Sequence, residues 1–149
     1  MNLTPRLASL LAALALAACA GQASLAGPGA ARLLPCPSAP HCVNSEDTDA
    51  RHAIAAFVLK QPAAQSWPQV VEVVRAMERT TVVEANARYL HAEIASPWHF
   101  YTDDLELLLD AAGRAQVRSA SRIGYYDFDV NRERVENLRR RLAARDLLR

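Results

Sequence analysis

The chain of 149 residues has none of the short motifs that mark common enzyme classes. It carries no Gly-x-Ser-x-Gly segment, no Cys-x-x-Cys pair and no glycine-rich phosphate loop, and no internal repeat is visible. Charge of one sign is also lacking, because the formal net charge is only +1 at neutral pH. A nucleic-acid-binding domain needs a basic stripe that neutralises phosphates, so we expect no nucleic-acid partner.

The histidines, acids and serines show no spacing that indicates catalysis or metal binding. The histidines lie at positions His41, His52, His91 and His99, with no i, i+4 pair on a predicted helix. Asp103 and Asp104 are neighbours, and neighbours on a strand point to opposite faces. We therefore predict no catalytic residue, no metal site and no cofactor, and a hydrolase that uses these acids and serines is the weakest hypothesis.

Long hydrophobic runs are absent except at the N-terminus. Residues 7–18 form an apolar run that follows one basic residue, Arg6, and this run is too short to span a membrane. The segment Leu16-Ala17-Ala18-Cys19 resembles the bacterial lipobox, in which the signal is removed before a cysteine that is then acylated. Ordinary secretion with cleavage after Ala20 is the alternative, because small residues also surround that position.

The N-terminal pattern predicts a lipoprotein of the cell envelope. Residues 1–18 would be the signal peptide and Cys19 the membrane anchor, since each buried acyl methylene contributes about 0.8 kcal/mol. Ala20 after the cysteine resembles lipoproteins sent to the Gram-negative outer membrane, facing the periplasm. Residues 19–34 are small and rich in Gly and Ala, which predicts a flexible tether. Residues 35–149 then form a single domain.

The chain has few cysteines, and acylation of Cys19 would leave only Cys36 and Cys42 for a disulfide, a metal site or redox chemistry. An even pair in an exported domain favours a disulfide, and closing so short a loop would contribute about 2 kcal/mol. A metal site that uses these thiolates with His41 or His52 is one alternative, but the spacing fits none of the usual zinc patterns. A redox role is the other alternative.

The hydrophobic pattern predicts an α+β domain made of a helix, a four-stranded antiparallel meander and a C-terminal helix. The first helix is expected over residues 66–79, with Ser66 as its N-cap. Its apolar face would consist of Trp67, Val70, Val74 and Met77. The strands are expected at residues 80–85, 88–95, 103–110 and 115–122. Residues 52–59 are a candidate edge strand, and both helices are expected on one face of the sheet.

The last helix is expected to begin near Asp129, a suitable N-cap residue. Its inward-facing residues would be Val135, Leu138 and Leu142. Its last turns carry Arg139, Arg140, Arg141 and Arg145. Arginines are favourable near the negative end of a helix dipole, so we interpret them as a solvated helix end. Contact with anionic lipid headgroups is the alternative.

A hairpin between the last two strands determines where the polar residues of this region point. If Asp110 pairs with Arg114, the register places Leu105 opposite Ser119 and Asp103 opposite Ser121. The same register places Glu106 opposite Arg118 on the other face. One face is then apolar near the turn and polar at the far end, beside the start of the last helix.

This polar end allows two interpretations. Asn131, Arg132 and Arg134, together with Tyr101 and Tyr125, could line a pocket with an apolar wall and converging polar groups. Alternatively, an aspartate pairs with Arg122 or Arg134 and only locks the strand to the helix. The ligand-binding candidates under the first interpretation are Asp103, Asp104, Arg118, Ser119, Ser121, Arg122, Asp127, Asn131 and Arg134.

Three segments in order, "CPSAPHCVNS", "FYTDDLEL" and "VRSASRIGYYDFDVNRERVENLR", resemble the bacterial and plastid domain-of-unknown-function family 1499. The resemblance runs from about residue 35 to residue 142. The matching positions are Cys36, Pro37, Ser38, Pro40, Cys42, Val43, Ser45, Phe100, Asp103, Asp104, Glu106, Arg118, Ser119, Ser121, Arg122, Gly124, Asp127, Asn131 and Arg134. The departures are His41 for Asn, Asn44 for Ser and Asp129 for Gly, and we expect the last to improve the helix cap.

The family supplies no activity, so the functional hypotheses depend on the residues. The first is a non-enzymatic envelope domain that binds a small polar or amphipathic ligand. The alternative is an interaction or scaffold protein of the envelope, whose polar cluster only stabilises the fold. The partners expected are the membrane, through Cys19, and either an unknown small molecule or an envelope protein.

Overall fold

The computed structural model of the chain describes residues 22–149, apart from the side chain of His99. The predicted signal peptide (residues 1–18) and the predicted acylation site Cys19 lie outside the described residues. Neither of the two described α-helices has the length and apolar composition needed to cross a bilayer.

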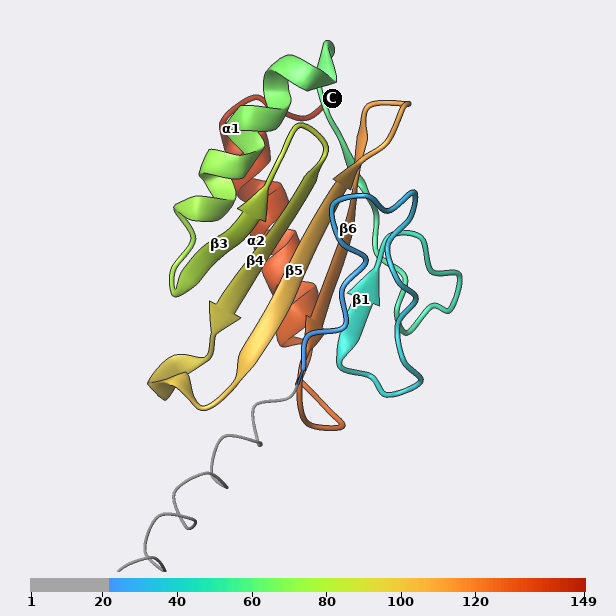
Figure 1. Cartoon of the computed structure of the whole chain (residues 1–149), viewed down its shortest axis with the longest axis vertical. Coiled ribbons are helices and arrows are strands. Elements are labelled where there is room, and N and C mark those ends of the chain that lie inside the picture. Colours follow the sequence, from blue (N-terminus) through green and yellow to red (C-terminus); the bar gives the residue numbers. More distant parts are fainter. Residues whose placement is uncertain (1–21) are drawn as a thin grey trace, which may run out of the picture.

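The domain is an α+β fold built on one antiparallel sheet (Figure 1). The strands are β1 (Cys42–Asn44), β2 (Phe57–Val58), β3 (Thr80–Ala85), β4 (Tyr89–Ala95), β5 (Thr102–Leu109) and β6 (Arg114–Ser121). Their order is β1-β6-β5-β4-β3, and β2 pairs with the other end of the β6 edge. The predicted meander is confirmed as β3 to β6. The sheet is larger than the predicted four strands because β1 and β2 are added. β2 lies within the candidate edge strand at residues 52–59, whereas β1 is too short to show alternation in the sequence.

Both helices, α1 (Ala63–Arg75) and α2 (Val130–Ala144), pack on the same face of the sheet. The core that they share with the strands is continuous. It contains Trp67, Val70 and Val74 from α1, Val135, Leu138 and Leu142 from α2, and Leu90, Ala92, Ile94, Leu105, Leu107, Leu109, Ala115 and Val117 from the sheet. The predicted apolar faces of both helices and of the hairpin are therefore confirmed, and so is the β5–β6 register.

The start of α1 differs from the prediction, whereas α2 begins beside Asp129 as predicted but without the expected side-chain cap. The first helix begins at Ala63, so Ser66 lies inside it and its hydroxyl donates to the carbonyl of Lys60 at 3.1 Å. Asp129 does stand at the N-cap of α2, but its φ is 64° and its side chain makes no capping hydrogen bond. Asp127 Oδ2 instead accepts from the backbone N–H of Asn131 at 3.1 Å. The expectation that Asp129 improves the cap was wrong, because this left-handed position favours glycine.

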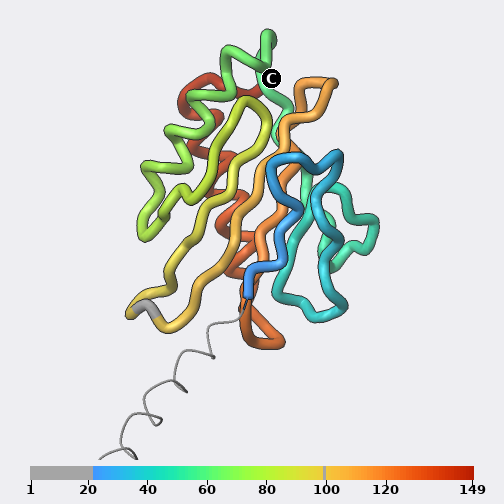
Figure 2. Tube along the Cα trace, in the orientation of Figure 1, coloured from blue at the N-terminus to red at the C-terminus, as the bar shows by residue number. Residues whose placement is uncertain are grey.

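Residues 22–34, which form no helix or strand, cover part of the second face of the sheet and leave β3 exposed (Figures 1 and 2). Leu33 and Ala26 pack against Tyr89 of β4 and Leu108 of β5. The side chain of Asn44 also donates to the carbonyl of Leu34 at 2.8 Å. Most of the segment that composition predicts as tether is therefore packed on the sheet in the structure.

Candidate functional site

The polar residues of β5 and β6 alternate between the two faces of the sheet. Asp103, Ser119 and Ser121 face the helices, whereas their neighbours Asp104, Arg118 and Arg122 face residues 22–34. The single candidate cluster of the sequence is thus two clusters. We call Asp103, Ser119, Ser121, Asp127, Asn131 and Arg134 the helix-face network. We call Tyr89, His91, Glu93, Asp104, Glu106, Arg118 and Arg122 the cover-face network.

The helix-face network is closed on itself. Arg134 Nη2 donates to Asp103 Oδ2 at 2.5 Å, and its Nη1 donates to Ser119 Oγ at 3.0 Å. Ser119 Oγ in turn donates to Asn131 Oδ1 at 2.6 Å. Asn131 is completely buried, and its amide donates to Ser121 Oγ and to Asp127 Oδ2. These groups hydrogen-bond one another, so they connect β5 and β6 to the start of α2.

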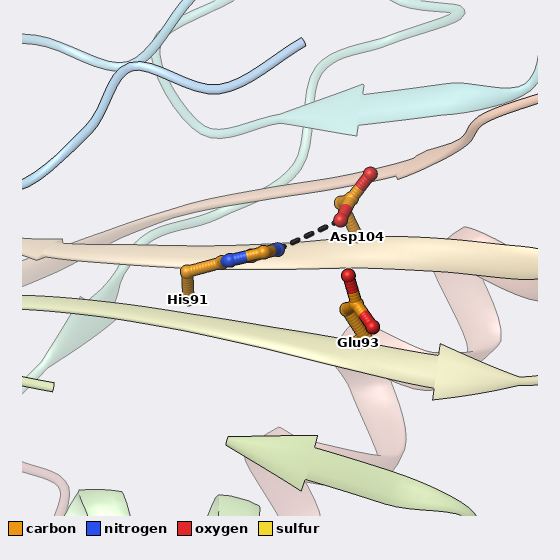
Figure 3. A group of neighbouring side chains, drawn as sticks. All are labelled: His91, Glu93 and Asp104. Atoms are coloured by element: carbon orange, nitrogen blue, oxygen red, sulfur yellow. Dashed lines mark hydrogen bonds and ion pairs between the residues drawn. The ribbon is translucent and has the colours of Figure 1, made fainter. Parts of the chain in front are cut away.

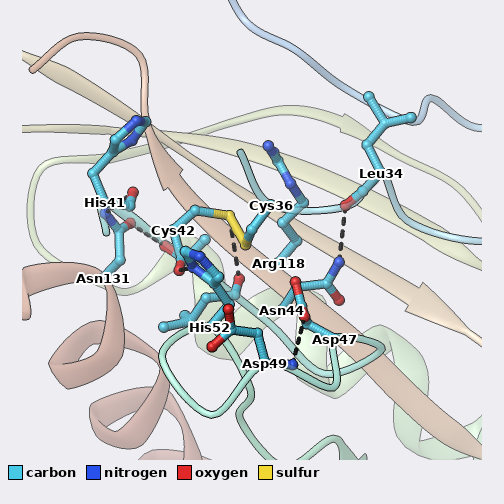
Figure 4. Close-up of a disulfide and its surroundings, with 12 residues drawn as sticks. Leu34, Cys36, His41, Cys42, Asn44, Asp47, Asp49, His52, Arg118 and Asn131 are labelled. Atoms are coloured by element: carbon cyan, nitrogen blue, oxygen red, sulfur yellow. Dashed lines mark hydrogen bonds between the residues drawn. A yellow bond between two sulfur atoms is a disulfide. The ribbon is translucent and has the colours of Figure 1, made fainter. Parts of the chain in front are cut away.

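The disulfide loop contributes a main-chain atom to the helix-face network. Cys36 and Cys42 form the predicted disulfide, with their Cα atoms 5.6 Å apart (Figure 4). His41, which lies next to Cys42, accepts hydrogen bonds at its carbonyl from the Ser121 N–H at 3.0 Å and from Asn131 Nδ2 at 3.1 Å. The crosslink thus holds a backbone acceptor over the end of β6 and the first turn of α2.

The cover-face network buries a charged pair in the middle of the sheet. Glu106 has no exposed surface, and its Oε1 accepts from Tyr89 Oη and from the backbone N–H of Ala26, each at 2.8 Å. Arg118 Nη1 lies 3.6 Å from Glu106 Oε2 and donates to the carbonyl of Ser24 at 3.1 Å. Burial, then the hydrogen bond to Glu106, raises the pKa of Tyr89 above its ordinary 10.0. Burial lowers the pKa of Arg118, and the charge of Glu106 opposes this effect.

Two acids and one histidine come close enough to suggest a metal site. Ligand atoms of His91, Glu93 and Asp104 lie within 4.8 Å of one another (Figure 3). However, Arg122 donates to both oxygens of Asp104, at 2.9 and 2.8 Å, and also to Glu93. The Arg122 guanidinium therefore supplies the positive charge that a metal ion would otherwise supply to these two carboxylates. We interpret the group as a salt-bridge cluster.

Asp104 is almost fully buried, and its charged form is stabilised by its hydrogen-bond partners. Burial would raise the pKa of its carboxyl group, but the hydrogen bonds from Arg122 and His91 outweigh burial and lower the pKa below 3.8. The hydrogen bond to Asp104 likewise raises the pKa of Arg122. His91 Nε2 lies 2.7 Å from Asp104 Oδ1, so the imidazole donates to the carboxylate.

A cavity of about 290 Å³ opens between two loops at one end of the sheet. The loops are residues 96–101, between β4 and β5, and residues 122–129, between β6 and α2 (Figure 1). Asp103, Ser121 and Asp127 supply the polar part of the lining. Its apolar and aromatic part consists of Tyr101, Ile123, Tyr126, Phe128 and Val130.

The structure divides the nine predicted binding residues between the two faces of the sheet. Six of them belong to the helix-face network, and three of these six, Asp103, Ser121 and Asp127, also line the cavity. The other three, Asp104, Arg118 and Arg122, belong to the opposite face. The five residues expected to converge, Asp103, Ser119, Ser121, Asn131 and Arg134, are joined by hydrogen bonds. Asp104, Arg118 and Arg122 lie on the other side of the sheet because neighbours on a strand alternate.

Most aromatic side chains of the cavity were missed by sequence reasoning, although a signal was present. The chain has nine aromatic residues, and six of them fall in the two loops. These six are Trp98, Phe100, Tyr101, Tyr125, Tyr126 and Phe128. Each is more than half exposed, while Phe57, Trp67 and Tyr89 are buried. Aromatic residues gathered in turns rather than in strands are typical of a binding surface.

Comparison with known proteins agrees with the three motifs. A family model described as protein of unknown function (DUF1499) matches residues 32–142, which include the disulfide and both networks apart from their main-chain partners in residues 22–31. No curated protein and no solved structure matches the chain. The match covers most of the domain, and the chain belongs to the DUF1499 family.

Proposed function

We propose that this protein is a lipid-anchored domain of the cell envelope that binds a small amphipathic ligand without catalysing a reaction. Cys19 would hold it at the outer membrane, facing the periplasm. The observation that carries the proposal is the cavity between the two aromatic loops, where apolar walls meet the polar groups of Asp103, Ser121 and Asp127. Pockets of this mixed chemistry orient a ligand by a few polar contacts and bind it by apolar contact.

The size of the cavity limits the ligand. A volume of about 290 Å³ lies at the lower end of the range for small-molecule sites. It suits a small amphiphile, or one part of a larger one such as a headgroup. A second cavity, of about 360 Å³, lies between residues 22–24 and the disulfide loop. Its charged groups Asp104 and Arg122 already pair with each other, so it is the weaker candidate.

The arrangement of the side chains argues against a hydrolase. Ser119 and Ser121 hydrogen-bond to Asn131, so among the described residues no imidazole activates either hydroxyl. Among the described side chains the one buried His–Asp pair, His91 with Asp104, lies on the other face of the sheet. A nucleophile and its base must be within hydrogen-bond reach, and here the sheet separates them.

Native mass spectrometry of the Cys19→Ala chain, exported to the periplasm, tests the proposal. The native mass should exceed the denatured mass by one ligand, and this excess should be lost in the double variant Tyr126→Ala/Phe128→Ala. Val83→Ala, a similarly exposed apolar site on β3, is the matched control and should keep the ligand. Equal native and denatured masses for the parent chain would refute ligand binding, as would an excess that survives the double variant.

The alternative function is that of an interaction or scaffold protein, and one observation favours it. Arg134 donates to Asp103, Ser119 and Asn131, so it has a structural role whether or not a ligand exists. Under this alternative, Arg134→Ala lowers the melting temperature and every variant has equal native and denatured masses. Crosslinking in the periplasm would then identify a protein partner.

A further inference from the structure

We infer that the aromatic end of the sheet docks on the bilayer surface beside the lipid anchor. This end, called the loop end, consists of residues 96–101 and 122–130. The occupant is the phospholipid leaflet in which the anchor lies. The inference rests on the acylation of Cys19 in the proposed function, and it adds the orientation of the domain on the membrane.

The first supporting observation is the exposure of large apolar side chains at the loop end. Trp98 is 84% exposed, Phe128 81% and Phe100 73%. Isolated exposed apolar residues are common, but Tyr101, Tyr126 and Phe128 line one cavity at this end, and aromatic residues gathered on one surface mark an interaction site. Trp and Tyr are enriched where a membrane meets water, because one part of each ring system is apolar and the other carries a polar group.

The second observation is where the chain enters the domain. The described chain begins at residue 22, and Figure 1 shows this blue start at the loop end, beside the loop between β6 and α2. Gln22 also lines a cavity together with Ser121 and Arg122 of that end. Three residues span at most about 11 Å, so an acylated Cys19 lies no farther than that from Gln22. The anchor itself therefore holds the loop end close to the leaflet.

The third observation is the charge of the loop end. Residues 96–101 contain no Asp, Glu, Lys or Arg. Residues 122–130 contain Arg122, which is paired with Asp104 and Glu93, and two acids, Asp127, which accepts from Asn131, and Asp129, so the described side chains of the loop end offer no free cation to anionic lipid. The arginine run of α2 lies toward its other end, and Arg139 donates to the carbonyls of Ala55 and Ala56. Docking is thus driven by apolar contact, and anionic lipids are not required.

Quenching of Trp98 by brominated lipids measures docking directly. The chain has two tryptophans, and Trp67 is only 3% exposed in the core. The acylated chain would be purified from membranes in detergent and reconstituted into phosphatidylcholine vesicles with or without brominated acyl chains. We expect bromination to reduce the tryptophan emission by roughly half, because one of the two indoles lies at the membrane interface. Trp98→Phe is the control and should abolish the quenching.

The outcomes separate this inference from the proposed function. The intact mass of the same sample reports acylation by itself. An acylated chain whose emission is not quenched overturns docking but leaves the anchor. A chain without acyl groups overturns the anchor and, with it, docking. An unquenched chain with twice the monomer mass in detergent would mean that the loop end binds a second copy, which also overturns docking. Quenching that 0.5 M salt abolishes would overturn the apolar mechanism.

Discussion

The two faces of the sheet bury their polar residues by different means. On the helix face, Asp103 and Arg134 lie at the end of an apolar core, and side chains supply nearly all of their partners. On the cover face, Glu106 and Arg118 lie in the middle of the sheet. Their additional partners are the main-chain N–H of Ala26 and the carbonyl of Ser24.

The difference follows from the backbone that covers each face. In the middle of a helix the N–H and C=O groups already bond to each other, so a helix offers an apolar surface. Residues 22–34 form no helix or strand, and their main-chain groups are free to meet buried charges. An irregular cover can therefore supply main-chain partners to a buried ion pair, although Glu106 Oε2 and Arg118 Nε have no hydrogen-bond partner among the described residues.

The largest expected effect is that of Arg118→Ala on the cover face. Among the described residues Arg118 is the one cation that pairs with Glu106, which has no exposed surface. We expect the free energy of unfolding to fall by about 4 kcal/mol, because an unpaired charge would remain buried. Urea unfolding measures this loss. The double variant Glu106→Gln/Arg118→Met should lose much less, and a loss below about 1 kcal/mol for Arg118→Ala would mean that water reaches Glu106.

A matched pair of leucine truncations compares the two covers. Leu138 is fully buried in the large core, whereas Leu33 belongs to a small cluster with Tyr89 and Leu108. We expect Leu138→Ala to cost about 3 to 4 kcal/mol and Leu33→Ala about 2 kcal/mol, since a thin segment can collapse into the space. Equal losses in the same unfolding experiment would show that residues 22–34 pack as rigidly as a helix.

Arg134→Ala tests the helix-face network. Removing the guanidinium leaves Asp103 without a cation and takes a donor from Ser119 and Asn131, so we expect a loss of about 2 to 3 kcal/mol. The stability of Arg134→Lys should lie between those of the parent chain and Arg134→Ala, because lysine keeps the charge but not the forked geometry of the guanidinium. Thermal and urea unfolding measure both. If Arg134→Lys is as stable as the parent chain, the fork makes no contribution.

The pH dependence of stability reports on Asp104. Its folded pKa lies below the ordinary 3.8, so its contribution is present above pH 3.8 and is lost as the pH falls through the lowered value. We expect the free energy of unfolding to decrease below about pH 4 in the parent chain and to decrease less steeply in Asp104→Asn. Parallel pH profiles for the two chains would contradict the pairing with Arg122.

The smallest expected effect is a gain at the start of α2. Phe128 and Asp129 both have positive φ, at 56° and 64°. Asp129→Gly should raise the free energy of unfolding by about 0.5 kcal/mol, because glycine adopts this conformation without steric cost and no cap is lost. Phe128→Gly is unsuitable as a control, since Phe128 lines the cavity. A loss of stability in Asp129→Gly would mean that the negative charge of Asp129 stabilises the N-terminus of α2 by more than its left-handed backbone costs.

Local features account for what was predicted correctly. The strand at residues 80–85 has the predicted bounds because its β-branched residues favour an extended backbone. The β5–β6 register follows from the hairpin in which Asp110 pairs with Arg114, where Gly113 takes a φ of 78°. The start of α1 was missed because Ser66 and Gln69 have the spacing of a capping box. In the structure the Ser66 hydroxyl donates instead to the carbonyl of Lys60 from within the helix.

The sequence by itself determined the order of the elements, the disulfide between neighbouring cysteines and the alternation that separates Asp103 from Asp104. These features follow from backbone geometry over a few residues. Only the tertiary structure decided that residues 22–34 cover part of the second face and bury Glu106, and that Tyr101 and residues from the loop after β6 line one cavity. Ala26 and Glu106 lie 80 positions apart, and contacts at such separations depend on how the whole chain packs rather than on any local pattern.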